Sequence, residues 1–220
     1  MRAAGDHTSR ANCALPLKDS GMPLPETLKS VREWFSERGL RGRVQTIDGS
    51  RLDQAIAGLG YTETVGPALR QSAPLLPALK ILRDSADPRR TAEITKELPE
   101  DYFTVYRRGL GIPEFQAILT TGDAEIAFAV VRGDNAEALS VGRVTIDTAT
   151  RHAGIAALAT AEHARRQGLA RIVLRELLAF SAERGAESTY LEVDEQNAPA
   201  LALYESLGYT TAHRYHCRLL

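Results

Sequence analysis

The chain has 220 residues, of which 44% are hydrophobic and 25% are charged, and its formal net charge is −1 at pH 7. A chain of this size buries one good core or two small domains, and its charge creates no overall field that would attract nucleic acid or an anionic membrane. Because no apolar run reaches roughly 18–20 residues and the first residues lack a signal-peptide core, we expect neither a membrane span nor export.

The N-terminal part of the chain predicts short, alternating elements. Alternation of Ala11, Cys13, Leu15 and Leu17 with polar residues indicates a half-buried strand within an extended segment 1–20. The expected elements that follow are a helix over 26–38 that ends at Gly39, a strand over 44–47, a helix over 52–59, and an extended segment over 61–72.

A segment rich in proline and charge follows, and it predicts a domain boundary. The residues that carry this prediction are Pro74, Pro77, Asp87, Pro88, Arg89 and Arg90. We therefore expect an N-terminal domain over 1–78, a linker over 79–90 and a second domain over 91–220.

The second domain predicts a mixture of strands and helices, and thus an α/β (α+β) fold. A hairpin is indicated by two apolar runs on either side of Gly133-Asp134-Asn135, which is a strong turn signal. The expected strands cover 91–98, 124–132, 138–147, 153–160, 188–193 and 209–220, and the expected helices cover 99–108, 113–120, 169–184 and 198–207.

The two parts of the chain share an internal echo. Glu37-Arg38-Gly39 and Glu183-Arg184-Gly185 each end a long helix, and a strand and a short helix follow both. The two repeated stretches end in Leu59-Gly60-Tyr61-Thr62 and Leu207-Gly208-Tyr209-Thr210. Aligned on those residues, Tyr204 corresponds to Ile56. We interpret the first copy as a degenerate repeat that keeps the packing pattern without the chemical groups; the alternative is two ordinary units with coincident glycine stops.

A glycine turn opens the clearest helix of the sequence. Its residues are Arg165, Arg166, Gln167, Gly168, Leu169 and Ala170. Free backbone N–H groups at the positive end of a helix dipole suit a pyrophosphate, and glycine lets the phosphate approach the backbone. The alternative is a solvated basic helix start.

Three polar residues downstream are candidates for chemistry. Tyr204 is protonated at neutral pH and could act as a general acid, or it is a core tyrosine. Glu192 lies between apolar Leu191 and Val193, so alternation places it on the opposite face, as a base or as an exposed carboxylate. Asn197 is at least a helix cap.

Metal and disulfide chemistry find little support in the sequence. Alternation places His213 and Cys217 on one face of the last strand and His216 on the other, which argues against a metal site. Cys13 and Cys217 lie at opposite ends of the chain and make no disulfide framework, which fits a reducing cytoplasm.

These residues resemble the signatures of the GNAT superfamily of acyl-CoA-dependent N-acyltransferases. Arg165, Gly168 and Ala170 match the donor-binding pattern Arg/Gln-x-x-Gly-x-Gly/Ala. The strand–helix signature is matched by Leu191-Glu192-Val193, Asn197, Ala200, Leu203-Tyr204 and Gly208-Tyr209. The resemblance covers about 91–220. Residues 185–209 look particularly like bacterial N-terminal acetyltransferases that modify ribosomal proteins, and the start of the chain looks like that of longer proteins with a degenerate N-terminal half.

The resemblance implies a mixed, splayed sheet flanked by helices, preceded by a smaller degenerate GNAT-like half. It implies that backbone N–H groups from Arg166 to Ala170 hold the CoA pyrophosphate, with Arg165 beside them. The strand end at Leu158, Ala159 and Thr160 would pair with the pantetheine arm, and Asn197 would lie near it. Tyr204 would protonate the leaving thiolate, and Glu192 would be the base, directly or through water.

The function that follows from the resemblance is acetyl transfer from acetyl-CoA to an amine, without a metal. The acceptor is either a protein N-terminus or a small-molecule amine, and acceptor specificity is expected in the loop 107–111 and in the last strand. The resemblance allows for a homodimer. The alternative function is a non-catalytic acyl-CoA sensor or assembly module. A final strand usual in the family would be missing or supplied by the N-terminal half.

Overall fold

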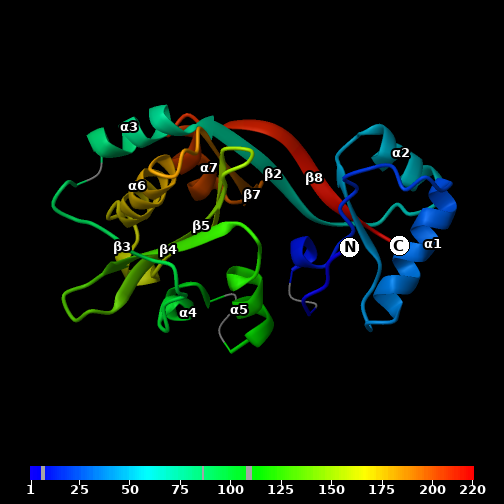
Figure 1. Ribbon diagram of the computed structural model, residues 1–220, viewed down its shortest axis with the longest axis horizontal. Helices are drawn as coiled ribbons and strands as arrows, with labels where there is room; N and C mark the ends of the chain where they lie inside the picture. Colours follow the sequence, from blue (N-terminus) through cyan, green and yellow to red (C-terminus); the bar gives the residue numbers. More distant parts are fainter. Residues whose placement is uncertain (6–7, 86, 108–110) are drawn as a thin grey trace. The chain divides into compact units, whose positions relative to one another are not determined.

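The computed structural model describes residues 1–5, 8–85, 87–107 and 111–220 (Figure 1). The chain divides into two compact units. Unit 1 contains Met1–Arg70, Val193–Asn197 and Thr211–Leu220, and unit 2 contains Gln71–Glu192 and Ala198–Thr210. Each unit is therefore assembled from segments that lie far apart in the sequence.

Unit 1 is built on strands at the two ends of the sequence. It contains η1 (Ser9–Ala11), α1 (Leu24–Ser36), β1 (Arg43–Ile47), α2 (Arg51–Gly58), the first part of β2 (Thr64–Pro74) and most of β8 (Thr210–Leu219). The strand order is β1-β8-β2, and β1 pairs antiparallel with β8. Apolar residues at helical spacing in α1 pack with β1 and α2 in one core that includes Leu28, Phe35, Val44 and Ile56.

Unit 2 contains the larger part of the sheet, in the order β2-β7-β6-β5-β4-β3. Its strands are the end of β2, β3 (Glu93–Thr95), β4 (Glu125–Arg132), β5 (Ala138–Asp147), β6 (His152–Thr160) and most of β7 (Ser188–Asp194). Its helices are α3 (Leu75–Ser85), α4 (Tyr102–Val105), α5 (Pro113–Thr120), η3 (Glu162–Ala164), α6 (Leu169–Ala182) and α7 (Ala198–Glu205). The strands β3 to β6 are antiparallel neighbours, whereas β6 and β7 are parallel. This is the mixed sheet that the sequence predicts.

The two faces of this sheet are covered by different helices (Figure 1). The long helix α6 packs on β4, β5 and β6, and α3 packs on α6. A Cβ atom at Gly142 of β5 would lie 2.6 Å from Val173 of α6, so glycine lets this helix approach the strand closely. The opposite face carries Val141 and Phe128, which pack with Tyr102 of α4. Both faces are therefore buried around β5.

The strand β2 has an unexpected place in the sheet. It comes from the N-terminal part of the sequence, yet the strand order places it between β7 and β8. The N-terminal half thus supplies a strand at this position of the sheet. None of the helices in the described ranges is long and apolar enough to cross a membrane.

The segment expected as a linker over 79–90 differs from that expectation in its described residues. Residues up to Ser85 belong to α3, whose Leu79 and Leu82 are buried. Pro77 suggested a break, but proline is tolerated in the first turn of a helix, where no intrahelical N–H bond is lost. After the helix, the carbonyl groups of Asp87 and Arg90 accept hydrogen bonds from Arg175 of α6. The division into domains over 1–78 and 91–220 stays a prediction.

Other expected elements are shorter in the structure. The expected strand over 1–20 is reduced to isolated bridges at Cys13 and Ala14, and Leu17 is exposed, because η1 interrupts the alternating pattern. The strand expected over 91–98 is limited to Glu93–Thr95. The helix expected over 99–108 covers Tyr102–Val105, and the end of the expected range lies outside the described residues.

Candidate active site

The turn between β6 and α6 presents a row of backbone N–H groups. Gly168 precedes α6 with φ 76° and ψ 4°, and Arg166 also has a left-handed φ of 65°. Within the described part of the chain, no protein group accepts a hydrogen bond from the backbone N–H of Arg166, Gln167, Gly168, Leu169 or Ala170. Such a run of free donors at a helix N-terminus forms an anion-binding concavity.

The side chains around this turn leave the backbone accessible. Arg165, Arg166, Gln167 and Gly168 are exposed, whereas Leu169 is buried and anchors the helix start in the core. A Cβ atom built on Gly168 would meet no atom within 4 Å. Arg165 lies 3.9 Å from a carboxylate oxygen of Glu162, an exposed pair that leaves the arginine available to a ligand. The geometry therefore suits a phosphate-bearing ligand with additional attraction from cationic side chains.

Beside this turn, the sheet is splayed. β6 and β7 pair only from His152↔Ser188 to Ile155↔Leu191, although β6 continues to Thr160. The last residues of β6, Leu158, Ala159 and Thr160, are half-buried. On the β5 side, Thr160 pairs with Ser140 and Ala159 with Val141. The opposite edge of this strand end therefore lies beyond the pairing with β7, as a binding strand for an extended ligand requires.

A β-bulge shapes the strand where the fork begins. The register between β5 and β6 shifts between Val141 and Arg143, and Ala157 has a left-handed φ of 51°. The carbonyl of Ala157 accepts a hydrogen bond of 2.9 Å from the hydroxyl of buried Tyr102. Burial raises the pKa of Tyr102, so this phenol remains a donor. Tyr102 holds the bulge in place, and the sequence signalled it only as part of a helix.

Tyr204 lies in a nearly dry position on α7. It is 7% exposed, and burial raises its pKa to about 12. Its ring lies 5.7 Å from that of Tyr209, whose hydroxyl forms a 3.0 Å hydrogen bond with the hydroxyl of Thr189. No such partner exists for the Tyr204 hydroxyl among the described residues. Tyr204 therefore carries a proton at neutral pH that no acceptor in the described part of the protein engages.

Glu192 and Asn197 occupy different settings. Glu192 is half-buried on β7, on the face opposite Leu191, as alternation predicts. Tyr190, two residues earlier on the same face, lies over Gly154, where a Cβ atom would come within 2.7 Å of the phenol. Glu192 belongs to unit 2 with the glycine turn and Tyr204, whereas exposed Asn197 falls in unit 1 and its backbone N–H donates to the carbonyl of Asp194.

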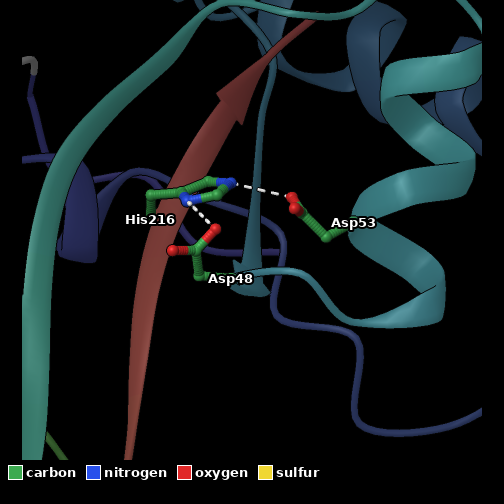
Figure 2. Close-up of side chains that lie close together, drawn as sticks. All are labelled: Asp48, Asp53 and His216. Atoms are coloured by element: carbon green, nitrogen blue, oxygen red, sulfur yellow. Dashed lines mark hydrogen bonds and ion pairs between the residues drawn. The ribbon is translucent and has the colours of Figure 1, made fainter.

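A second polar cluster lies in unit 1 and was missed by sequence reasoning. Figure 2 shows His216 of β8 between the carboxylates of Asp48 and Asp53. Its Nε2 lies 2.7 Å from Asp53 and its Nδ1 3.7 Å from Asp48. His216 lies in the last strand, whereas Asp48 and Asp53 lie near residue 50, so no local sequence motif signals the cluster.

The carboxylate of Asp53 is already engaged by protein donors. Arg218 donates to both of its oxygens, at 2.5 and 2.9 Å, and Thr46 and the backbone N–H of Gly49 add further hydrogen bonds. Burial favours the neutral acid, but hydrogen bonds led by that from Arg218 outweigh it and hold the pKa of Asp53 well below its usual range. We interpret the cluster as a structural ion network, because a metal ion would have to displace Arg218.

The comparisons with known proteins agree with this geometry. The splayed mixed sheet and the glycine turn define an N-acetyltransferase of the GNAT superfamily. A family model described as "Probable histone acetyltransferase Rv0428c C-terminal" matches residues 1–218, and the chain belongs to this family.

Individual relatives support the same class. The chain is 31% identical over 120 residues to "[Ribosomal protein bS18]-alanine N-acetyltransferase" of Escherichia coli K12, a match that covers 54% of the chain and 78% of that protein. Among solved structures, a GCN5-related N-acetyltransferase from Kribbella flavida has a TM-score of 0.66 at 15% identity and covers 89% of this chain and 74% of its own. A tandem GNAT protein from the clavulanic acid biosynthesis pathway has a TM-score of 0.67 at 12% identity, with coverage of 86% and 67%. At these identities the two structures show the fold alone.

Proposed function

We propose that the chain transfers an acetyl group from acetyl-CoA to a primary amine by direct attack on the thioester. The observation that carries this proposal is the run of five backbone N–H groups, from Arg166 to Ala170, without a protein acceptor in the described residues. They lie beside a strand end that is splayed from its neighbour, and the two features fit the two ends of one molecule. The pyrophosphate would bind the amides, and the amide-bearing arm would extend along Leu158, Ala159 and Thr160.

The remaining residues would supply proton transfer. Glu192 would take a proton from the attacking amine, directly or through water, as the new N–C bond forms. Tyr204 would give its proton to the departing sulfur as the C–S bond breaks, because its raised pKa keeps the phenol protonated throughout the neutral range. No metal ion takes part in this proposal.

The acceptor in this proposal is a protein N-terminus or a small-molecule amine. The sequence match to an enzyme named for alanine acetylation on a ribosomal protein favours peptides with N-terminal alanine as the first acceptors to test. We further propose that the protein acts in the cytoplasm, and that unit 1 includes a decayed copy of the catalytic half.

Calorimetric titration with acetyl-CoA, followed by mass spectrometry of amine acceptors, tests the proposal. We expect saturable binding and the gain of one acetyl group on an acceptor. Absence of binding at millimolar acetyl-CoA would overturn it. Binding without transfer to any member of a broad amine panel would instead favour the second candidate, a non-catalytic acyl-CoA sensor or assembly module.

A further inference from the structure

Arg143 of β5 occupies a position that the proposed mechanism does not use. Its Cα partner on β6 is Ala156, the first residue beyond the last β6–β7 pair, Ile155↔Leu191. Because neighbouring strands lie about 4.8 Å apart, Arg143 is one strand away from the point where the fork begins. A long side chain at this position can reach a molecule bound at the mouth of the fork.

The register also fixes the face on which Arg143 lies. Residue Gly142 faces α6, so its neighbour Arg143 lies on the opposite face. Thr145, two residues on, is paired with Gly154, and Gly154 is paired with Tyr190 of β7. Tyr190 shares its face with Glu192. Arg143 and the proposed base therefore lie on the same face of the sheet, across β6 from one another.

The guanidinium of Arg143 has few partners. Its Nε donates a 2.6 Å hydrogen bond to the carbonyl of Leu119 near the end of α5. In the part of the chain that the structure describes, no carboxylate forms an ion pair with it, and neither terminal nitrogen donates to a protein acceptor. Burial lowers the pKa of Arg143, and electrostatic interactions with Tyr102 and Tyr190 offset part of this decrease. Neither terminal nitrogen is among the buried side-chain atoms without a partner, so both are open to water, and an anionic ligand can take the place of that water.

Two other arginines of the same unit are already satisfied. Arg132 on the neighbouring strand β4 pairs with Asp101 at 2.6 Å and with Glu93 at 3.2 Å. Arg175 of α6 is buried, yet it donates to two backbone carbonyls and to Glu176. Arg143 thus differs from them in what its terminal nitrogens contact, and its planar pair of donors matches a carboxylate.

We propose that Arg143 binds a carboxylate of the acceptor, so that this enzyme selects amines that also carry a carboxylate group. This inference rests on the proposed acetyl transfer and specifies its acceptor. The competing explanation is that Arg143 only caps the C-terminal end of α5 through Leu119.

The test compares matched acceptors that differ in one charge. Two pairs serve: peptides with N-terminal alanine followed by glutamate or glutamine, and a free amino acid with its amide. We expect wild-type kcat/KM to be about 10–100-fold higher for the carboxylate member of at least one pair, the range of one charge-assisted hydrogen bond. In Arg143→Gln this preference should vanish through a higher KM for the carboxylate member, with the neutral member and the affinity for acetyl-CoA unchanged.

Two further variants keep the outcome decisive. Arg132→Gln removes a charge that is already paired and should leave the preference intact. Arg143→Lys retains the charge without the planar fork and should keep part of the preference, even if Arg143→Gln does not fold. Equal wild-type activity on both members of both pairs overturns this inference but leaves acetyl transfer standing. Equal loss on both members in Arg143→Gln assigns Arg143 to structure. Transfer to no acceptor at all refutes the proposed function itself.

Discussion

Two segments of the chain, 24–74 and 169–219, pass through the same order of elements and carry different chemistry. Each runs helix, strand, short helix, strand: α1-β1-α2-β2 and α6-β7-α7-β8. Their long helices end alike, since Gly39 and Gly185 both have left-handed φ values, 67° and 80°. The echo in the sequence thus corresponds to a repeated structural pattern, while its origin by duplication stays a prediction.

The segments differ first in how their long helices begin. α1 follows Pro23 and has a proline in its first turn, which occupies positions where N–H groups would otherwise be free. α6 follows left-handed Gly168 and leaves its first N–H groups without protein acceptors in the described residues. A proline start suits a helix that only packs, and a glycine start suits one that binds an anion.

They differ next in the use of polar residues around the short helix. In the first segment Asp53 lies in the first turn of α2, and its carboxylate binds Arg218 and His216 of β8. In the second segment the position equivalent to buried Ile56 is Tyr204, whose hydroxyl has no protein partner among the described residues. The same packing pattern therefore accommodates two kinds of polar group. In the first segment the polar groups bond to other protein groups, and in the second a hydroxyl without a partner among the described residues is left for a ligand.

The largest effect is expected from breaking the ion network of the first segment. Asp53→Ala leaves Arg218 and His216 without their carboxylate in a buried position, so the free energy of unfolding should fall by about 3–5 kcal/mol. Denaturant unfolding measures it. Exposed Asp84→Ala, which loses only a pair with Lys80, should cost no more than about 0.5 kcal/mol. Similar small losses in both variants would show that the network does not stabilise unit 1.

The same carboxylate predicts a pH dependence. The pKa of Asp53 is lower in the folded chain than the usual value near 4, so the unfolded chain binds more protons in acid. The stabilisation that the Asp53 carboxylate contributes to the fold is therefore complete above about pH 4, and it is lost as the pH falls toward the folded-state pKa. Unfolding measured from pH 7 to pH 3 should show a steeper acid loss in the wild type than in Asp53→Ala. Parallel curves would contradict the assignment.

In the second segment, Tyr204→Phe should lower turnover about 100-fold or more, the usual contribution of a general acid. Because its hydroxyl has no protein partner in the described chain, phenylalanine leaves no donor or acceptor unsatisfied, and stability and acetyl-CoA affinity should hardly change. Steady-state kinetics and calorimetry separate these quantities. Ile56→Val, at the equivalent position, should cost about 0.5–1.5 kcal/mol of stability and no turnover. Unchanged turnover in Tyr204→Phe would remove the phenol from the chemistry.

The smallest effect concerns the glycine turn. Gly168→Ala adds a methyl group beside the free amides and places alanine at a φ of 76°, which costs roughly 1–2 kcal/mol. We expect acetyl-CoA to bind about 5–30-fold more weakly, as calorimetry would show. Gly185→Ala carries the same strain at a φ of 80° at the other end of α6 and should reduce stability alone. Equal affinities in both variants would argue against pyrophosphate binding at this turn.

Much of the fold was predictable because its signals are local. Short stretches of sequence predict the helix α6 from its periodicity, the hairpin between β4 and β5 from its turn, and the helix ends from their glycines. α3 was missed because Pro77 stands within its first turn, where a helix tolerates it. The expected loop 107–111 includes residues 108–110, which lie outside the described residues.

The sequence by itself determined the family and the glycine turn, and it marked Glu192 and Tyr204 as candidates for proton transfer, since short motifs at fixed spacing specify them. Only the tertiary structure decided that β2 lies between β7 and β8, that Asp53 meets Arg218, and that Arg143 lies one strand from the fork. The physical reason is the sequence separation of the partners. Strand pairing joins Arg43 to Leu219, and a buried ion pair joins Asp53 to Arg218, 165 positions away. No local pattern encodes which of many such pairings gives the lowest free energy.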